Sequence, residues 1–240
     1  MSKEMKEAYE ETQQEPLYEK APTDPALQQQ LLFQLLFDPL DMVSYGRQTL
    51  FNSNLTNQMF DPQFNCIPPL AKIGEPPLMA INPGRPSAKG GLPQVNMLPR
   101  TFLFEIDDMA LDAQFKFWIE SGIPFTAINY TGNKSLHILV RLKEALSLEA
   151  YEGLHKAVVK CIEEKFKVFP DSATCKPNRT TKIPGFDGKV TTTALLAYSS
   201  YGTVDNEQFI EWAYSIGVTS TLVKGMQKTS IYRNSGSFKR

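Results

Sequence analysis

Two acidic side chains interrupt an apolar stretch near the middle of the chain. The segment FLFEIDDM places Glu105 and Asp107 two residues apart, directly after the apolar residues 102–104. Because side chains alternate across a β-strand, both carboxylates are expected on one face of a strand. Neighbouring carboxylates in apolar surroundings cost free energy unless a cation or a basic partner neutralises them. The spacing therefore indicates a site for a divalent metal ion.

A second polar pair follows with the same spacing. Ser135 and His137 lie two residues apart in TGNKSLHILV, where apolar side chains fill the alternate positions. This pair is also predicted to share one face of a strand. A third polar stretch, PDSATCKPNRTTKIPG, is expected to bring Asp171, Arg179 and Lys182 within reach of the same place.

The elements that must position these residues follow from apolar periodicity and turn signals. Alternating stretches indicate four strands, stripes at helical spacing indicate two helices, and the Gly132-Asn133 pair indicates a hairpin. The strands are expected at 102–107, 125–130, 135–142 and 193–199, and the helices at 111–119 and 147–166. The order β-α-β-β-α-β is the split βαβ arrangement, an α+β palm of the RRM-like, ferredoxin-like type.

In that arrangement the first and third strands lie side by side at the centre of the sheet, and the fourth strand lies beside the first. Both helices are expected to cover one face and to leave the other open. The two polar pairs would then point from adjacent strands into the open face. RRM-like domains bind nucleic acid on such a face, and polymerase palms hold metal ions there.

Together, EIDD, GNKSLH and a PD followed by NR and KIPG resemble the motifs of the archaeo-eukaryotic primase superfamily, which has the prim-pol fold. Within it the likeness is greatest to the primases of phages and mobile elements. Two positions depart from the family's pattern: Glu105 stands where many members have Asp, and Asn133 stands where Gly is common. Glu is an equally good oxygen ligand, and Asn tolerates turn geometry.

The resemblance implies a role for each site residue. Glu105, Asp107 and Asp171 would hold two Mg²⁺ or Mn²⁺ ions that activate a primer 3′-hydroxyl for attack on the α-phosphate of a nucleotide. The hydroxyl and basic side chains of the three motifs would bind the nucleotide phosphates. These are Ser135, His137, Arg179 and Lys182, with Lys134 one residue out of phase on its strand.

The function implied is template-directed nucleotidyl transfer. The resemblance describes a DNA primase or primase-polymerase of a phage or mobile element, which makes primers on single-stranded DNA from NTP or dNTP. No Walker A loop precedes Ser135, because Ile128 stands where its first Gly would be, so a separate replicative helicase is the expected partner. Whether the product is RNA or DNA does not follow from the sequence.

Other functions stay open on the sequence alone. A non-catalytic RRM-like nucleic-acid-binding module would need outward aromatic side chains, and the expected strands offer few. A metal-dependent rolling-circle-type nuclease would need a His-x-His pair, whereas His137 is unpaired and His155 is expected to be structural. A repair polymerase would share the same palm.

Composition divides the 240 residues into four parts. Residues 1–25 carry seven acids against three lysines and are expected to be a disordered acidic tail. Residues 26–100 begin with an apolar helix at 26–37 and form a helical or irregular unit that packs on the palm at 101–220. Residues 221–240 form a basic tail that can contact phosphates or remain solvated.

Cellular location follows from two further features. No apolar run is long enough to span a bilayer, and the acidic N-terminus does not resemble a signal peptide. Three cysteines lie far apart without a C-x-x-C pair, which argues against a zinc finger and a disulfide framework. Free thiols and a cytoplasmic location are therefore expected.

Overall fold

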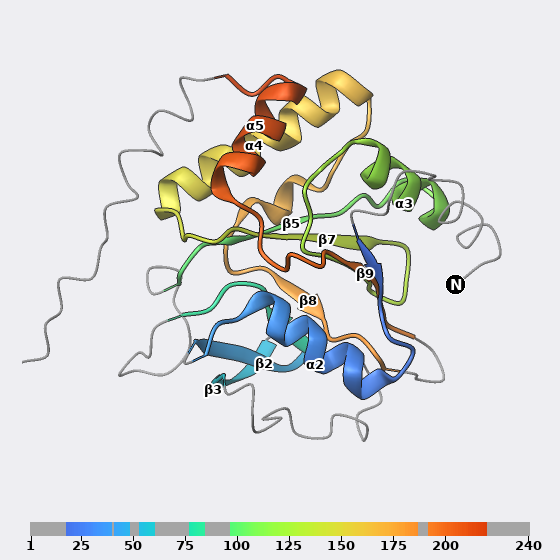
Figure 1. Ribbon diagram of the computed structural model, residues 1–240, viewed down its shortest axis with the longest axis vertical. Helices are drawn as coiled ribbons and strands as arrows, with labels where there is room; N and C mark the ends of the chain where they lie inside the picture. The colour runs from blue at the N-terminus through green and yellow to red at the C-terminus, as the bar shows by residue number, and fades with distance from the viewer. Residues whose placement is uncertain are drawn as a thin grey trace, which may run out of the picture.

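Helices are interspersed among short strands along the chain (Figure 1). The computed structural model describes residues 18–39, 41–48, 53–60, 77–84, 97–186 and 192–219. The elements are β1 (Glu19–Lys20), α2 (Pro25–Leu36), β2 (Met42–Gln48), β3 (Ser53–Met59), β4 (Leu78–Ala80), β5 (Thr101–Phe104), α3 (Leu111–Glu120), β6 (Ala127–Tyr130), β7 (Leu136–Arg141), α4 (Leu148–Phe166), the 3-10 helix η3 (Ser172–Cys175), β8 (Thr180–Lys182), β9 (Ala194–Tyr198) and α5 (Asn206–Ile216). The predicted basic tail at 221–240 lies outside these ranges.

Helix α4 forms where the sequence predicts it. Its buried residues Tyr151, Leu154, Val158 and Ile162 recur every three or four positions, so one stripe of the helix faces the core. The Ser147 hydroxyl accepts a hydrogen bond from the Ala150 amide at 3.2 Å, which satisfies one of the free N–H groups of the first turn. The predicted N-cap is therefore confirmed.

The first sheet has the strand order β1-β9-β6-β7-β5, and all its pairs are antiparallel. The α+β class, the β6–β7 hairpin and the contact between β5 and β7 are confirmed. The position predicted for the fourth strand is wrong, because β9 pairs with β6 and β5 lies at an edge of the described sheet. The chain leaves the sheet at β8, which pairs with β4 elsewhere, and returns to it on the far side.

Both faces of this sheet are covered, so the prediction of an open face is wrong. Phe102 and Phe104 face the core beneath α3, α4 and α5, whereas Leu103 and Leu139 pack against α2 and a second sheet of order β3-β2-β4-β8. Figure 1 shows the three helices on one side of the first sheet and α2 with the second sheet on the other. The strands are apolar at successive positions because both their faces are buried.

The predicted unit at 26–100 is not self-contained. Its expected helix is confirmed as α2, and three further strands, β2, β3 and β4, follow it. The second sheet is completed by β8, which comes from the segment predicted as a loop of the palm. Residues from both predicted units therefore share one sheet and one apolar core.

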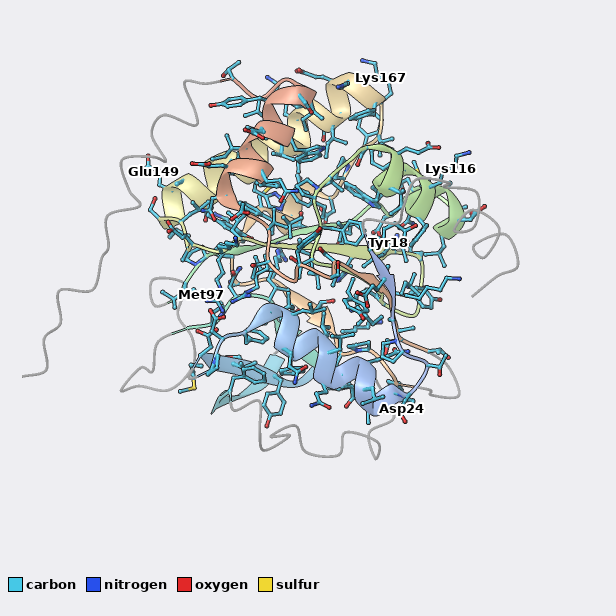
Figure 2. The ribbon with its side chains drawn as sticks, viewed as in Figure 1. Tyr18, Asp24, Met97, Lys116, Glu149 and Lys167 are labelled. Atoms are coloured by element: carbon cyan, nitrogen blue, oxygen red, sulfur yellow. The ribbon has the colours of Figure 1, made fainter. Side chains whose placement is uncertain are left out.

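The predicted acidic tail is too long at its C-terminal end. Tyr18 is 5% exposed and packs against Phe115 and Phe125, with ring centroids 6.4 Å and 5.7 Å away. The following residues pair as β1 with β9, and Asp24 caps α2 by accepting from two backbone amides (Figure 2). Aromatic burial and capping therefore hold residues 18–25, while residues 1–17 lie outside the described ranges.

Two sequence-based expectations concern membranes and thiols. Within the described ranges no helix has both the length and the apolar character that crossing a bilayer requires. Cys161 and Cys175 are free thiols, as predicted, and Cys66 lies outside the described ranges.

An ionic cluster joins α2 to the first sheet at the end where α2 stops. The Asp38 carboxylate contacts Arg100 Nη1 at 2.7 Å and Arg141 Nη2 at 2.5 Å, and Arg100 also pairs with Asp41. Burial alone would raise the pKa of Asp38, but the hydrogen bonds and charges of the two arginines outweigh it and lower that pKa. The cluster therefore stabilises the packing of the layers while Asp38 is ionised.

We expect the free energy of unfolding of Asp38→Asn to fall less than that of the wild type as the pH is lowered. A depressed pKa adds stability that is present above the unfolded value near 4 and is lost as pH falls through the lower folded value. Urea unfolding from pH 7 to pH 3 should show the wild type losing more stability than the variant. Parallel profiles for the two proteins would contradict this account of the cluster.

Backbone conformation and a close contact explain why the KIPG motif has glycine at position 185. Gly185 has a φ of +75°, and an added Cβ would lie 2.4 Å from the Pro25 carbonyl oxygen. Gly185→Ala should therefore lower the free energy of unfolding by about 1–3 kcal/mol, measured by urea unfolding. Gly153→Ala is the matched control, because nothing lies within 4 Å of its added Cβ inside α4. That variant should gain up to about 1 kcal/mol, and equal effects of the two changes would refute the explanation.

Candidate active site

Strand register brings the two predicted polar pairs together. Strands β5 and β7 are antiparallel with Phe104 opposite Ile138, so the register continued beyond β5 sets Glu105 opposite His137. The Glu105 carboxylate lies 2.6 Å from His137 Nε2, and the Ser135 hydroxyl donates to Asp107 at 2.9 Å. The prediction that the pairs share a face is confirmed.

The two carboxylates have different basic partners. Hydrogen bonding from His137 is the largest influence on Glu105 and lowers its pKa against the effect of burial. Burial would raise the pKa of Asp107, but hydrogen bonds from Lys134 and Ser135 outweigh it and lower that pKa too. Both acids are therefore ionised at neutral pH.

Lys134 reaches the site although the sequence predicts it out of phase. Its Nζ lies 3.0 Å from Asp107 Oδ2, and its side chain is 58% exposed. It precedes the first residue of β7, so strict strand alternation does not apply to it. The preceding turn uses Gly132 at a φ of +81°, whereas Asn133 does not have a positive φ. The departure at Asn133 therefore carries no backbone strain.

Asp171 is brought beside the first carboxylate by main-chain contact. Its amide donates to the Glu105 carbonyl oxygen at 2.9 Å. Its side chain accepts from the Ala173 amide at 2.8 Å and so caps η3. The three predicted acids therefore lie around the end of β5.

The structure treats the two predicted basic residues of the third motif differently. Arg179 accepts from the Ile81 amide through its carbonyl oxygen, and its buried Nε has no hydrogen-bond partner among the described residues. Strand alternation puts Arg179 on the same face as Thr181 and puts the Lys182 side chain on the opposite face. Lys182 contributes its carbonyl oxygen, which accepts from Asn129. The phosphate-binding roles of Arg179 and Lys182 stay predictions.

Sequence reasoning missed Asn129 and Thr181. Asn129 Nδ2 donates to Thr181 Oγ1 at 2.9 Å, and that oxygen lies 2.9 Å from His137 Nδ1. Both ring nitrogens of His137 are therefore engaged. A signal for Asn129 was present, because it is a polar residue in the apolar strand β6 and lies directly opposite His137.

Gln114 was also missed, and it holds two segments of the site together. From α3, its amide nitrogen donates to the carbonyl oxygens of Met109 and Lys134 at 2.7 Å, and its oxygen accepts from the Leu136 amide at 2.9 Å. It is fully buried. Gln114 thus fixes the loop after β5 against the hairpin that carries Ser135. A lone Gln in a helical pattern gives no sequence signal for this role.

His155 is structural, as predicted. It is fully buried, with Nε2 2.8 Å from the Leu103 carbonyl oxygen and Nδ1 3.0 Å from Cys175 Sγ. Burial lowers the pKa of His155 to about 4 and raises that of the Cys175 thiol to about 11. The pair is therefore neutral and links η3 to β5.

The chemistry of the carboxylates fits a hard divalent cation. No three His, Cys, Asp or Glu side chains in the described ranges converge closely enough to enclose a metal ion. Glu105 and Asp107 are nevertheless ionised oxygen donors two residues apart, which suits Mg²⁺ or Mn²⁺. Because the Lys134 ammonium is largely exposed, a divalent ion can replace it at Asp107.

The chain is similar in structure to primase proteins. It is 16% identical to the archaeo-eukaryotic primase domain of the cyanophage S-2L primase-polymerase, with a TM-score of 0.55 over 82% of this chain and 100% of that one. It is 13% identical to the catalytic domain of primase RepB', solved with initiator DNA, with a TM-score of 0.51 over 85% of this chain and 97% of that one. No protein-family model and no curated protein matches the sequence. At these identities the likeness concerns the fold, and it confirms the expected prim-pol fold.

We expect Gln114→Ala to lower the free energy of unfolding by about 2 kcal/mol or more, because two carbonyls and one amide lose their buried partner. Gln208→Ala is the control, since Gln208 is exposed on α5, and it should change stability by less than about 0.5 kcal/mol. Urea unfolding of both variants checks this. Equal free energies of unfolding for the two variants would show that Gln114 does not hold the loop after β5 against the hairpin.

Proposed function

We propose that this protein is a template-directed nucleotidyltransferase, a primase or primase-polymerase that extends or makes primers on single-stranded DNA from NTP or dNTP. The observation that carries the proposal is the Glu105–Asp107 pair, held in register opposite Ser135 and His137 on the prim-pol fold. Two carboxylates facing a hydroxyl and an imidazole match what phosphoryl transfer needs: sites for cations and donors for phosphate oxygens.

Each residue then has a part in the reaction. Glu105 and Asp107, with Asp171 beside them, would hold Mg²⁺ or Mn²⁺, which when bound activates the 3′-hydroxyl and stabilises charge on the α-phosphate. The Ser135 hydroxyl and the Lys134 ammonium lie at the rim of the carboxylates, where they can donate to triphosphate oxygens. Arg179 would add positive charge from the loop before β8, whereas the Lys182 side chain would have to reach the triphosphate from the opposite face of that strand.

The proposed partners follow from the same reasoning. RepB' was solved with initiator DNA, which supports DNA as the template for this chain. A separate replicative helicase, an origin in a phage or mobile element, and a cytoplasmic location remain part of the proposal. Single-stranded DNA is favoured because the site must reach unpaired bases.

A non-catalytic RRM-like module is less well supported by the structure. Such modules stack bases on an exposed sheet face, whereas here α2 and the second sheet cover that face of the first sheet. A rolling-circle-type nuclease is also disfavoured, because His137 engages Glu105 and Thr181 and the other histidine, His155, is buried in the core.

We expect Glu105→Ala and Asp107→Ala to abolish incorporation of labelled nucleotides on single-stranded DNA with Mg²⁺ and with Mn²⁺, while the melting temperature stays near that of the wild type. Each change removes a proposed metal ligand and leaves the packed core unaltered. Asp112→Ala, on α3 outside the site, is the control and should keep activity. Near-normal nucleotide incorporation by both site variants would show that Glu105 and Asp107 are not metal ligands.

A further inference from the structure

A line of four polar side chains links the first sheet to β8 of the second sheet. It runs from Glu105 after β5, through His137 on β7, to Thr181 on β8 and Asn129 on β6. The successive contacts measure 2.6 Å, 2.9 Å and 2.9 Å. Thr181 and Asn129 are fully buried, and Thr181 belongs to the strand that the sequence predicted as a loop.

The direction of each hydrogen bond in this line can be assigned from its chemistry. Asn129 also contacts the Lys182 carbonyl oxygen at 2.8 Å, and because a carbonyl oxygen only accepts, the atom of Asn129 that faces it is Nδ2. The same Nδ2 donates to Thr181 Oγ1. The Thr181 hydroxyl is then free to donate its own proton to His137 Nδ1. That leaves the ring proton on Nε2, where it is donated to Glu105.

The opposite arrangement leaves a buried donor without an acceptor. If His137 Nδ1 carried a proton, it would donate to Thr181 Oγ1, and the Thr181 hydroxyl would need another acceptor in a fully buried position. Leaving a buried donor unpaired costs about 1–3 kcal/mol. The contacts therefore select the Nε2–H tautomer of the imidazole.

Asn129 is a polar residue on a buried strand, and one of its two polar side-chain atoms is unpaired among the described residues. Its Oδ1 is buried and has no hydrogen-bond partner within the part of the chain that the structure describes. An apolar residue on the buried strand β6 would avoid that penalty. The two hydrogen bonds that its Nδ2 donates to β8 place Asn129 in the polar line.

We infer that Thr181 and Asn129 are positioning residues for His137: they support from the Nδ1 side the tautomer that the ionised Glu105 requires, and they orient the imidazole so that its Nε2–H edge faces the carboxylate site. The second sheet then contributes to the site through β8 as well as covering the first sheet. The consequence for nucleotide use rests on the proposed function, in which a metal ion would bind Glu105 and the Nε2–H of His137 would then be available to a phosphate oxygen. The tautomer itself does not depend on it.

Ring ¹⁵N chemical shifts of the histidines test the inference directly. The sequence has only two histidines, so each signal can be assigned, and His155 is an internal control held by Leu103 and Cys175. The wild type should show His137 protonated at Nε2 with an accepting Nδ1. In Thr181→Val the His137 Nδ1 loses the hydrogen bond that it accepts, so its ¹⁵N signal should shift, and Thr181→Ser should restore it. His155 should not move in either variant.

Nucleotide kinetics supply the second readout. Thr181→Val should raise KM for the nucleotide about tenfold with unchanged affinity for single-stranded DNA, and Thr181→Ser should recover it. Thr180→Val is the matched control, because Thr180 alternates to the other face of β8 and should match the wild type. If Thr181→Val fails to fold, Thr181→Ala replaces it in both measurements.

The outcomes separate the two proposals. His137 signals that are the same in folded Thr181→Val and the wild type, or a wild-type ring protonated at Nδ1, would overturn the inference. Shifted signals with unchanged nucleotide KM would overturn the positioning role. A wild-type chain that incorporates no nucleotide would instead refute the proposed function, and the ¹⁵N comparison would still decide the inference.

Discussion

The negative charge of Glu105 and Asp107 is the constraint on which the site depends. The Glu105 carboxylate is largely buried just beyond the end of β5 and needs a basic partner, whereas Asp107 is more exposed and lies close enough to be repelled by Glu105. The antiparallel register of β5 and β7 supplies partners for both carboxylates from a single hairpin, because His137 lies opposite Glu105 and Ser135 contacts Asp107. A one-residue slip of this register would turn the partners to the other face.

The second sheet explains how a palm without an open face can still hold a polar site. Apolar residues on both faces of the first sheet are buried. At the polar end of β7, however, Thr181 of β8 in the second sheet contacts His137. At the end of α2 the same layers are joined by the ionic cluster around Asp38. The layers are thus connected by apolar packing and by polar contacts at specific places, among them these two and the hydrogen bond from the Leu195 amide to Gln28 of α2.

The site acids and their hairpin could be predicted because their pattern is local. The spacing of Glu105 and Asp107, the Gly132-Asn133 turn and the helical stripe of α4 each fall within a short stretch of sequence. The second sheet could not be predicted, since β8 has three residues, none of them apolar, and becomes a strand only by pairing with β4. The roles of Thr181, Asn129 and Gln114 depend on such distant contacts and leave little trace in the sequence.

Template dependence of incorporation is the most direct test of the central claim. The full chain would be incubated with Mg²⁺ or Mn²⁺, labelled nucleotides and homopolymeric single-stranded DNA of each base. The account predicts label from adenine nucleotides on oligo(dT) and from guanine nucleotides on oligo(dC), with little product from mismatched pairs. Binding of these DNAs without any incorporation, or incorporation that ignores the template base, would contradict it.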